Sequence, residues 1–457
     1  MFNGKRSPVV VQEEFALIFA VLKWTTLAIL SGVIVGGGVT IFVELLEYSI
    51  KAASGLSHFW TYAGLPLGLT ASALSVRYLA PDASGHGTEK VVEAVHERAG
   101  DIELKVVPVK MLSTVFTVAL GGSAGKEGPA TQIAAGLTST LARWLKFNDY
   151  DKKKLVVCGV SAGFAAVFGT PVAGAVFALE VLYIGKIFYD VLFPSFISGV
   201  VAWRTALWLG LRYGSFPIDA AAIPYTLSNF GWAMLAGCFF GLVALCFIEL
   251  MNFCDNFFNR LRWPLVAKAL LGAALIALLT WQVGPEYLGL SDGAMAEILR
   301  GRGVPFFAWL WKTASTVLTL ACGGSGGVVT PIFYIGAAAG SAFAALCGLN
   351  SAVYASWGMV GVLAGCANAP LSSTIMAVEL FGSAAIPFAA VLCVTSFIIV
   401  GHRSVYPSQL LERTKSSLLV FPQPGRRIDQ VQIQVDLFRS PLLHHLHLRR
   451  KKKQQKV

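Results

Sequence analysis

The sequence predicts an all-α membrane protein that crosses the bilayer many times and contains a duplicated unit. Of its 457 residues, 55% are hydrophobic and 13% are charged, which is more apolar surface than one soluble core buries. Residues 110–129 (KMLSTVFTVALGGSAGKEGP) recur 202 positions later at residues 312–331 (KTASTVLTLACGGSGGVVTP), with eleven of twenty positions identical. Each copy carries a glycine-rich break beside an apolar segment. Matching breaks in two halves of a membrane protein indicate a solute site near the bilayer midplane.

Apolar runs predict where the helices lie. The run from Phe15 to about Leu46 is too long for the core of a signal peptide and predicts a long, tilted first helix. Further runs occur at about 64–80, 104–120, 187–210, 229–253, 264–284, 304–322, 330–349 and 385–401. Several reach the roughly 17–25 residues that span a bilayer. The shorter ones predict helices that are broken where their ends line a cavity.

Four parts of the chain follow from these runs and from the charge distribution. They are an N-terminal segment at 1–14, a first membrane repeat at 15–218, a second at 219–416 and a basic tail at 417–457. The tail has nine Lys and Arg against two Asp, so it carries +7 of the formal net charge of +11. Positive segments next to membrane helices favour the cytoplasm, so we expect cytoplasmic termini and contact with membrane lipid.

The tail does not indicate a nucleic-acid partner, because it has few aromatic residues and follows a membrane domain. An alternation of apolar and polar residues in it predicts a short strand, with the apolar positions at Val431, Ile433, Val435 and Leu437.

Metal and cofactor chemistry is not indicated. The eight cysteines contain no CxxC pair and mostly lie in apolar runs, which is typical of buried thiols. Four histidines are isolated, and the other three lie in the basic tail. No nucleophile and base are visible, which disfavours a polytopic membrane enzyme, although that class stays open.

The glycine-rich break at Gly121–Pro129 predicts an anion site. Its glycines let backbone approach a ligand closely, and Pro129 suits the first turn of a helix over about 129–145. The free N–H groups and positive dipole end of that helix then face the break and favour an anion. The second copy, Gly323–Pro331, predicts an equivalent helix start at about Val328. Two such starts would attract an anion without burying a full positive charge.

Glu127 lies inside the first break. A carboxylate at mid-membrane depth costs on the order of 2.5–3.5 kcal/mol, so it needs a compensating role. The N–H groups that hold an anion can also hold this carboxylate, which predicts a gate that a proton or an arriving anion releases. An N-terminal helix cap is the alternative. A phosphate-binding Walker loop is excluded, because position 120 is Leu and Glu127 follows Lys126.

These motifs resemble those of the CLC family of chloride channels and chloride/proton exchangers. GKEGP at 125–129 resembles the family's GREGP signature, and Ser84-Gly85-His86-Gly87 resembles its first filter segment, GSGIP. GGVVTP at 326–331 resembles GGIFAP, and Tyr406 stands where the family has an anion-contacting tyrosine. The likeness covers about residues 20–415.

The resemblance implies two inverted-topology repeats of broken and tilted helices, and a homodimer with one pore per subunit. It implies chloride transport in a bacterial inner membrane, without a cofactor. Chloride would contact the hydroxyls of Ser84 and Tyr406 and backbone near Gly85, Val328 and Val329. The filter loops would consist of Gly125, Lys126, Gly128, Pro129, Gly326, Gly327 and Pro331.

The chain departs from the family pattern at three places. His86 and Gly87 replace Ile-Pro in the first filter segment, and Val328-Val329 replace Ile-Phe. Val181 follows Glu180 where the exchangers commonly have a second glutamate, which relays protons from the cytoplasm. Passive chloride conduction is therefore somewhat favoured over proton exchange by another inner route.

Two further expectations follow from the same comparison with the family. Glu180 has a counterpart, Glu379, in the second repeat, which favours an architectural role for both. The family's fluoride-specific branch departs from the Ser and Tyr pattern, so Ser84 favours chloride over fluoride.

Overall fold

The computed structural model describes residues 8–54, 58–214, 224–421, 423–431 and 434–435, and these contain sixteen α-helices, which fall into two successive sets of eight. The first set is α1 (Pro8–Ser54), α2 (His58–Leu79), α3 (Thr88–Glu97), α4 (Val106–Ala119), α5 (Glu127–Trp144), α6 (Asp149–Phe168), α7 (Pro171–Glu180) and α8 (Leu192–Trp208). The second set is α9 (Leu227–Arg260), α10 (Leu265–Val283), α11 (Asp292–Leu299), α12 (Ala308–Ala321), α13 (Val329–Cys347), α14 (Ser351–Ala367), α15 (Pro370–Phe381) and α16 (Ile386–Val400).

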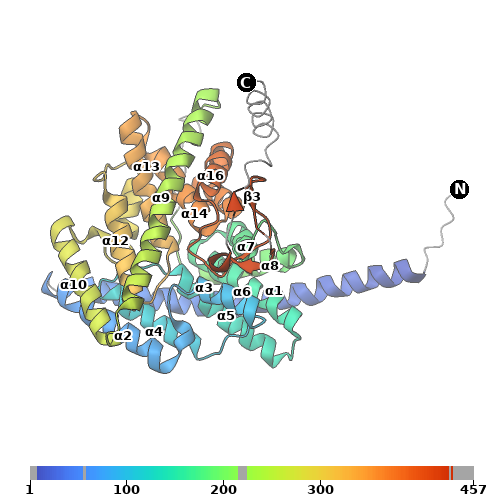
Figure 1. Cartoon of the computed structure of the whole chain (residues 1–457). Coiled ribbons are helices and arrows are strands. Elements are labelled where there is room, and N and C mark those ends of the chain that lie inside the picture. The colour runs from blue at the N-terminus through green and yellow to red at the C-terminus, as the bar shows by residue number, and fades with distance from the viewer. Residues whose placement is uncertain (1–7, 55–57, 215–223, 422, 432–433, 436–457) are drawn as a thin grey trace, which may run out of the picture.

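The lengths of these helices confirm an integral, multi-pass membrane protein of broken helices. Within the described residues, six helical segments are long and apolar enough to cross a bilayer, and they lie in α1, α8, α9, α10, α13 and α16. Four apolar helices are shorter, namely α4, α7, α14 and α15. In Figure 1 α1 runs across the lower half of the molecule and extends beyond its body toward the N-terminus. The predicted boundary between the repeats, at 218–219, lies outside the described residues.

The two helices predicted to start at the glycine-rich breaks begin within two residues of the predicted positions. α5 begins at Glu127 rather than at Pro129, because Pro129 occupies the third position of the first turn, where a missing N–H is still tolerated. α13 begins at Val329, and Val328 is its cap. α1 exceeds its apolar run at both ends, since polar residues continue the helix.

Very short strands occur after α7 and after α16. β1 (Tyr183–Ile184) pairs in parallel with β2 (Leu410–Leu411), and β2 pairs antiparallel with β4 (Arg426–Arg427). β3 (Leu419–Val420) pairs antiparallel with β5 (Gln434–Val435), which lies within the predicted tail strand. The other predicted positions of that strand are described only at Val431, which lies outside it. Short 3₁₀ helices occur at η1 (Pro81–Ala83), η2 (Tyr189–Val191), η4 (Pro285–Tyr287), η5 (Ser383–Ala385) and η6 (Ile428–Gln430).

The deepest part of the core is the helix pair α13 and α14. Nearly every side chain of both helices is buried. Their backbones touch at glycines, because a Cβ on Gly340 would lie 1.9 Å from the Tyr354 carbonyl oxygen. α13 and α14 are therefore packed backbone to backbone.

Candidate functional site

The two glycine-rich breaks lie against each other although 202 residues separate them in sequence. The Gly125 N–H donates to the Gly327 carbonyl at 2.7 Å, and the Gly327 N–H donates to the Gly125 carbonyl at 2.6 Å. The pairing is reciprocal, as expected for two copies of one unit related by a pseudo-twofold axis. The loops before α5 and α13 therefore form one structure at the interface of the repeats.

A second reciprocal pair of hydrogen bonds anchors these loops. The Ser123 N–H donates to the Thr319 hydroxyl of α12 at 3.0 Å, and the Ser325 N–H donates to the Thr117 hydroxyl of α4 at 2.9 Å. Each repeat thus satisfies buried backbone donors of the other. Rigid anchoring matters here because the loops set the positions of two helix starts.

The start of α3 completes the centre. A Cβ on Gly128 would lie 1.9 Å from the His86 carbonyl oxygen, so only glycine fits at that position. Gly87 has φ +85° and would bring a Cβ to 2.3 Å from the Gly128 carbonyl oxygen. Three segments, those before α3, α5 and α13, therefore meet in backbone contact.

The Glu127 carboxylate is at the N-terminus of α13. It is 1% exposed, and it accepts hydrogen bonds from the Thr330 N–H and from the Thr330 hydroxyl, the latter at 3.0 Å. Glycines surround it, since a Cβ on Gly125 would lie 2.3 Å from Glu127 Oε1 and one on Gly327 3.1 Å from Oε2. A side chain of one repeat thus occupies the free donors of the other repeat's helix start.

Thr330 is the partner that the sequence analysis did not select. It is the second residue of α13, and the N–H groups of the first helical positions have no partner within the helix. That rule applied to a helix starting at Val328 or Val329 would have found it. Val328 and Val329 themselves lie next to Thr330 at the helix start, each with a side chain that is 1% exposed.

Tyr406 lies in the same centre and has a free hydroxyl. Its side chain is fully buried, and its hydroxyl has no hydrogen-bond partner among the described residues. The Thr88 hydroxyl approaches it without completing a hydrogen bond, and the His86 ring is 5.6 Å away between centroids. A buried donor without a partner is costly unless a ligand satisfies it.

Ser84 and Gly85 form the turn that leads into α3, and a buried lysine holds that turn. The Lys110 ammonium donates to the Ala83 carbonyl at 3.1 Å and to the Gly85 carbonyl at 2.6 Å. Its counterpart Lys312 binds the turn before α11 in the same way. The Ser84 hydroxyl makes no hydrogen bond within the described part of the chain.

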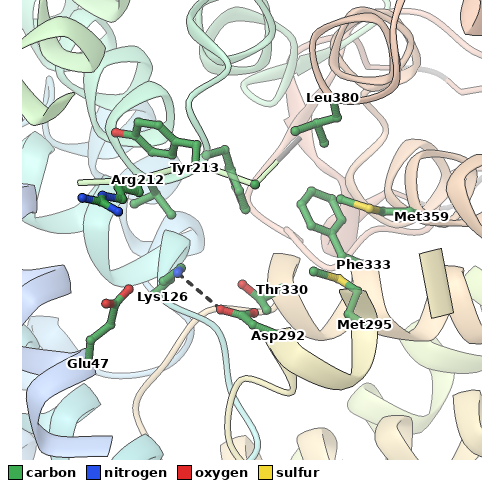
Figure 2. A pocket seen from close by; sticks show the side chains of 13 residues that line it. Glu47, Lys126, Arg212, Tyr213, Asp292, Met295, Thr330, Phe333, Met359 and Leu380 are labelled. Atoms are coloured by element: carbon green, nitrogen blue, oxygen red, sulfur yellow. Dashed lines mark hydrogen bonds and ion pairs between the residues drawn. The ribbon is translucent and has the colours of Figure 1, made fainter. Parts of the chain in front are cut away.

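Two cavities reach this centre. One, of about 580 Å³, is lined by Ser84 and Gly85 together with Arg77, Asp255, Lys268 and the loop 320–325. The other, of about 290 Å³, is lined by Thr330 and Lys126 together with Glu47, Arg212 and Asp292 (Figure 2). In it the Lys126 ammonium pairs with Asp292 at 3.4 Å. The first cavity thus reaches the second break at residues 323–325, and the other reaches the two breaks at Lys126 and Thr330.

The remaining predicted filter residues lie at the two helix starts and in the second break. Pro129 and Pro331 lie in the first turns of α5 and α13, and both are buried. A Cβ on Gly326 would lie 2.3 Å from Ala124 Cβ, so this glycine allows the two breaks to pack.

Glu180 and Glu379 cap each other's repeat. The Glu180 carboxylate accepts from the N–H groups of Leu371 and Ser372 at the start of α15, at 3.0 and 2.8 Å. The Glu379 carboxylate accepts from Val172 and Ala173 at the start of α7, at 3.0 and 2.8 Å. These contacts confirm the architectural role favoured for both glutamates.

Val181 is buried in the core. Its side chain is 1% exposed, and its carbonyl accepts a hydrogen bond from Gln409 at 2.9 Å. The Val181 side chain therefore cannot bind a proton, and its carbonyl is already hydrogen-bonded.

Comparison with known families and proteins gives one consistent result. Residues 67–401 match the family model described as voltage gated chloride channel. A chloride/fluoride channel protein of Pseudomonas syringae pv. tomato is 32% identical over 88% of this chain and 90% of its own length. An H(+)/Cl(−) exchange transporter of Cronobacter sakazakii is 26% identical over 83% of this chain and 86% of its own length.

Solved structures of the same fold also match. A CLC-type fluoride/proton antiporter is similar with a TM-score of 0.81 and 28% identity, over 86% of this chain and 99% of the other. A slow cyanobacterial Cl⁻/H⁺ antiporter is similar in fold with a TM-score of 0.72 and 20% identity, over 82% of this chain and 94% of the other.

Proposed function

Because the chain belongs to the voltage-gated chloride channel family and is an anion transporter of that family, we propose that Glu127 gates its transport site. The observation that supports this most directly is the position of the Glu127 carboxylate on the N–H and hydroxyl of Thr330. An anion at the start of α13 needs the same donors. Carboxylate and anion therefore compete, and an anion passes only when Glu127 has left.

The anion is held by dipoles rather than by a formal positive charge. Its donors are the hydroxyls of Ser84 and Tyr406 and the backbone N–H groups at Val328 and Val329. The Lys110 ammonium, which is buried beside the Ser84 turn, is already bound to backbone carbonyls. Such a site binds an anion strongly enough to enter and weakly enough to leave.

The Glu127 carboxylate can leave the donors at the start of α13 because an incoming anion or a proton offsets the interactions that hold it there. A helix N-terminus stabilises a negative charge by about 0.3–1 kcal/mol, and up to about 2 kcal/mol when partly buried. A hydrogen bond to a charged group adds about 1.5–3 kcal/mol. An incoming anion that takes over the same donors replaces most of this free energy, and a proton on Glu127 removes the charge that the donors stabilise.

Chloride is the first candidate anion, because the chain keeps both hydroxyl positions, Ser84 and Tyr406. Fluoride is the second candidate. It is supported by the names of two similar proteins, the chloride/fluoride channel protein at 32% identity and the fluoride/proton antiporter at 28% identity.

Two modes of transport fit this gate. Val181 favours passive conduction, since it offers no inner proton group. Exchange for protons is supported by a carboxylate that must leave its donors in each cycle, and by the names of the similar antiporter structures. We put proton exchange first, with passive conduction as the alternative.

Flux measurements in liposomes test the proposal. Purified protein is assayed for chloride and fluoride efflux with ion electrodes while a pH probe follows protons. We expect anion efflux that drives protons uphill in the opposite direction. Anion efflux without proton movement would refute exchange but keep the gated pore, whereas no anion efflux would refute transport itself.

A substitution of Glu127 tests its assignment as the gate. Glu127→Gln cannot carry the negative charge that competes with the anion, so we expect anion efflux that no longer responds to pH. Glu47→Gln is a matched control, because Glu47 lines the adjacent cavity without bonding to Thr330. A wild-type pH response in Glu127→Gln would contradict the assignment.

Assembly and location belong to the same proposal. A homodimer with one pore per subunit, in a bacterial inner membrane with cytoplasmic termini, follows from family likeness and from the basic tail. Cross-linking in membranes tests the dimer, and protease access to the tail tests on which side of the membrane the tail lies.

A further inference from the structure

Glu89 is a carboxylate that the gate does not use, and it connects two segments of the anion site. It lies in the first turn of α3, directly after the turn that carries Ser84 and Gly85. Its Oε1 accepts from the Ser408 N–H at 3.0 Å and from the Ser408 hydroxyl. Ser408 lies two residues after Tyr406 in the segment that leads to β2.

The other oxygen of this carboxylate is buried and unused. Glu89 Oε2 has no hydrogen-bond partner among the described residues. A buried carboxylate oxygen without a donor is unfavourable while the group is charged. A proton on Oε2 relieves that cost and leaves both bonds from Ser408 to Oε1 in place.

Tyr406 relates Glu89 to the gate. The His86 ring, three residues before Glu89, lies 5.6 Å from the Tyr406 ring between centroids, and the Tyr406 hydroxyl lacks a hydrogen-bond partner in the described structure. A hydroxyl can accept a hydrogen bond on its oxygen while it donates its own hydrogen to another group.

The charged groups that face Glu89 are few. Arg427 of β4 and Glu93 of the same helix interact with it electrostatically. Arg427 also pairs with Glu97 at 2.7 Å, so its charge is partly compensated. From α5, which packs against α3, the hydroxyl of Thr131 bonds to Thr88 and adds no charge.

Glu89 also lies beside the position of Val181. β1 and β2 pair in parallel with Tyr183 opposite Leu410. Gln409, the residue after Ser408, donates to the Val181 carbonyl at 2.9 Å, so the segment that holds the Glu89 carboxylate contacts Val181. Val181 itself offers no titratable group there.

We propose that Glu89 is the proton-binding group on the tail side of the anion site. Its carboxylate takes one proton from the tail side at Oε2 and becomes a neutral acid. It then gives one proton toward Tyr406, whose own hydroxyl proton passes to the Glu127 carboxylate. Glu89 is again a carboxylate, and Glu127, now neutral, releases its donors to the anion. The inference rests on the proposed proton exchange.

A purely structural role for Glu89 predicts a different outcome. In that case the carboxylate only ties α3 to Ser408 and stabilises the helix start. Glu89→Gln keeps the size of the side chain and an oxygen that accepts from Ser408, but it cannot exchange a proton. The substitution therefore separates the two roles.

The test measures anion and proton flux together in liposomes, for wild type, Glu89→Gln and the control Glu93→Gln. Glu93 is on the same helix, one turn later, and pairs with Lys90 at 2.8 Å. We expect Glu89→Gln to lose proton flux by at least about tenfold while anion flux remains. Glu93→Gln should keep both fluxes. Unchanged proton flux in Glu89→Gln overturns the inference.

A second variant covers the case in which Glu89→Gln does not fold. Ser408→Ala removes a hydroxyl donor to Oε1, so the Glu89 carboxylate loses stabilisation and takes its proton at higher pH. We expect the midpoint of the tail-side pH dependence of proton flux to rise. An unmoved midpoint overturns the inference. Anion flux without proton flux in the wild-type protein also overturns it, but this outcome leaves the proposed anion pore intact. Loss of all anion flux in wild type would instead refute the proposed function.

Discussion

Thr330→Val tests how strongly the start of α13 holds the gate. The substitution keeps the backbone N–H bond to Glu127 and removes the hydroxyl donor, which lies 3.0 Å from Glu127 Oε2. A hydrogen bond to a charged group contributes about 1.5–3 kcal/mol. At about 1.4 kcal/mol per pH unit, loss of this bond makes Glu127 accept its proton about one to two pH units higher. The hydroxyl stabilises only the charged carboxylate, so the shift is toward alkaline pH.

The assay follows anion efflux from liposomes across a pH series, and the midpoint of acid activation is the measured quantity. Thr280→Val is the matched control, because its buried hydroxyl bonds only within α10, to the Ile276 carbonyl at 2.8 Å. In the Glu127→Gln background, Thr330→Val should have no effect on the pH response. A midpoint that moves no further than in Thr280→Val would show that the Thr330 hydroxyl does not hold the gate.

Two other substitutions address the anion site and the architecture. Tyr406→Phe removes a buried, unpartnered donor and leaves the ring, so we expect weaker anion binding by about tenfold with unchanged thermal stability in detergent; unchanged apparent anion affinity would remove Tyr406 from the site. Glu379→Ala leaves two N–H groups at the start of α7 without their acceptor, so we expect a loss of stability of about 2–4 kcal/mol. A melting temperature equal to that of wild type would contradict the capping role of Glu379.

The class of the protein and the residues of the gate region followed from local features of the sequence. The duplicated breaks and Glu127 within one of them are visible along the chain, because each depends on a few neighbouring residues. Helix lengths were less certain at their ends, where α1 continues through polar residues.

The partners across the repeats could not be derived in this way. Glu127 meets Thr330, 203 residues away, and Glu89 meets Ser408, 319 residues away. No local pattern specifies which N–H or hydroxyl such a carboxylate reaches, since that depends on how all the helices pack. Lys110 is similar: the sequence shows a lysine in an apolar helix, and only the fold shows that it binds the carbonyls of the Ser84 turn.

The sequence by itself determined a duplicated membrane protein with two broken helix starts and one acidic residue in the first, because hydrophobicity, glycine and proline act over short distances. Only the tertiary structure decided that the breaks pair as Gly125 and Gly327, and that Thr330 receives Glu127. Those contacts depend on the close packing of two repeats, in which each buried polar group must find its partner on the opposite half.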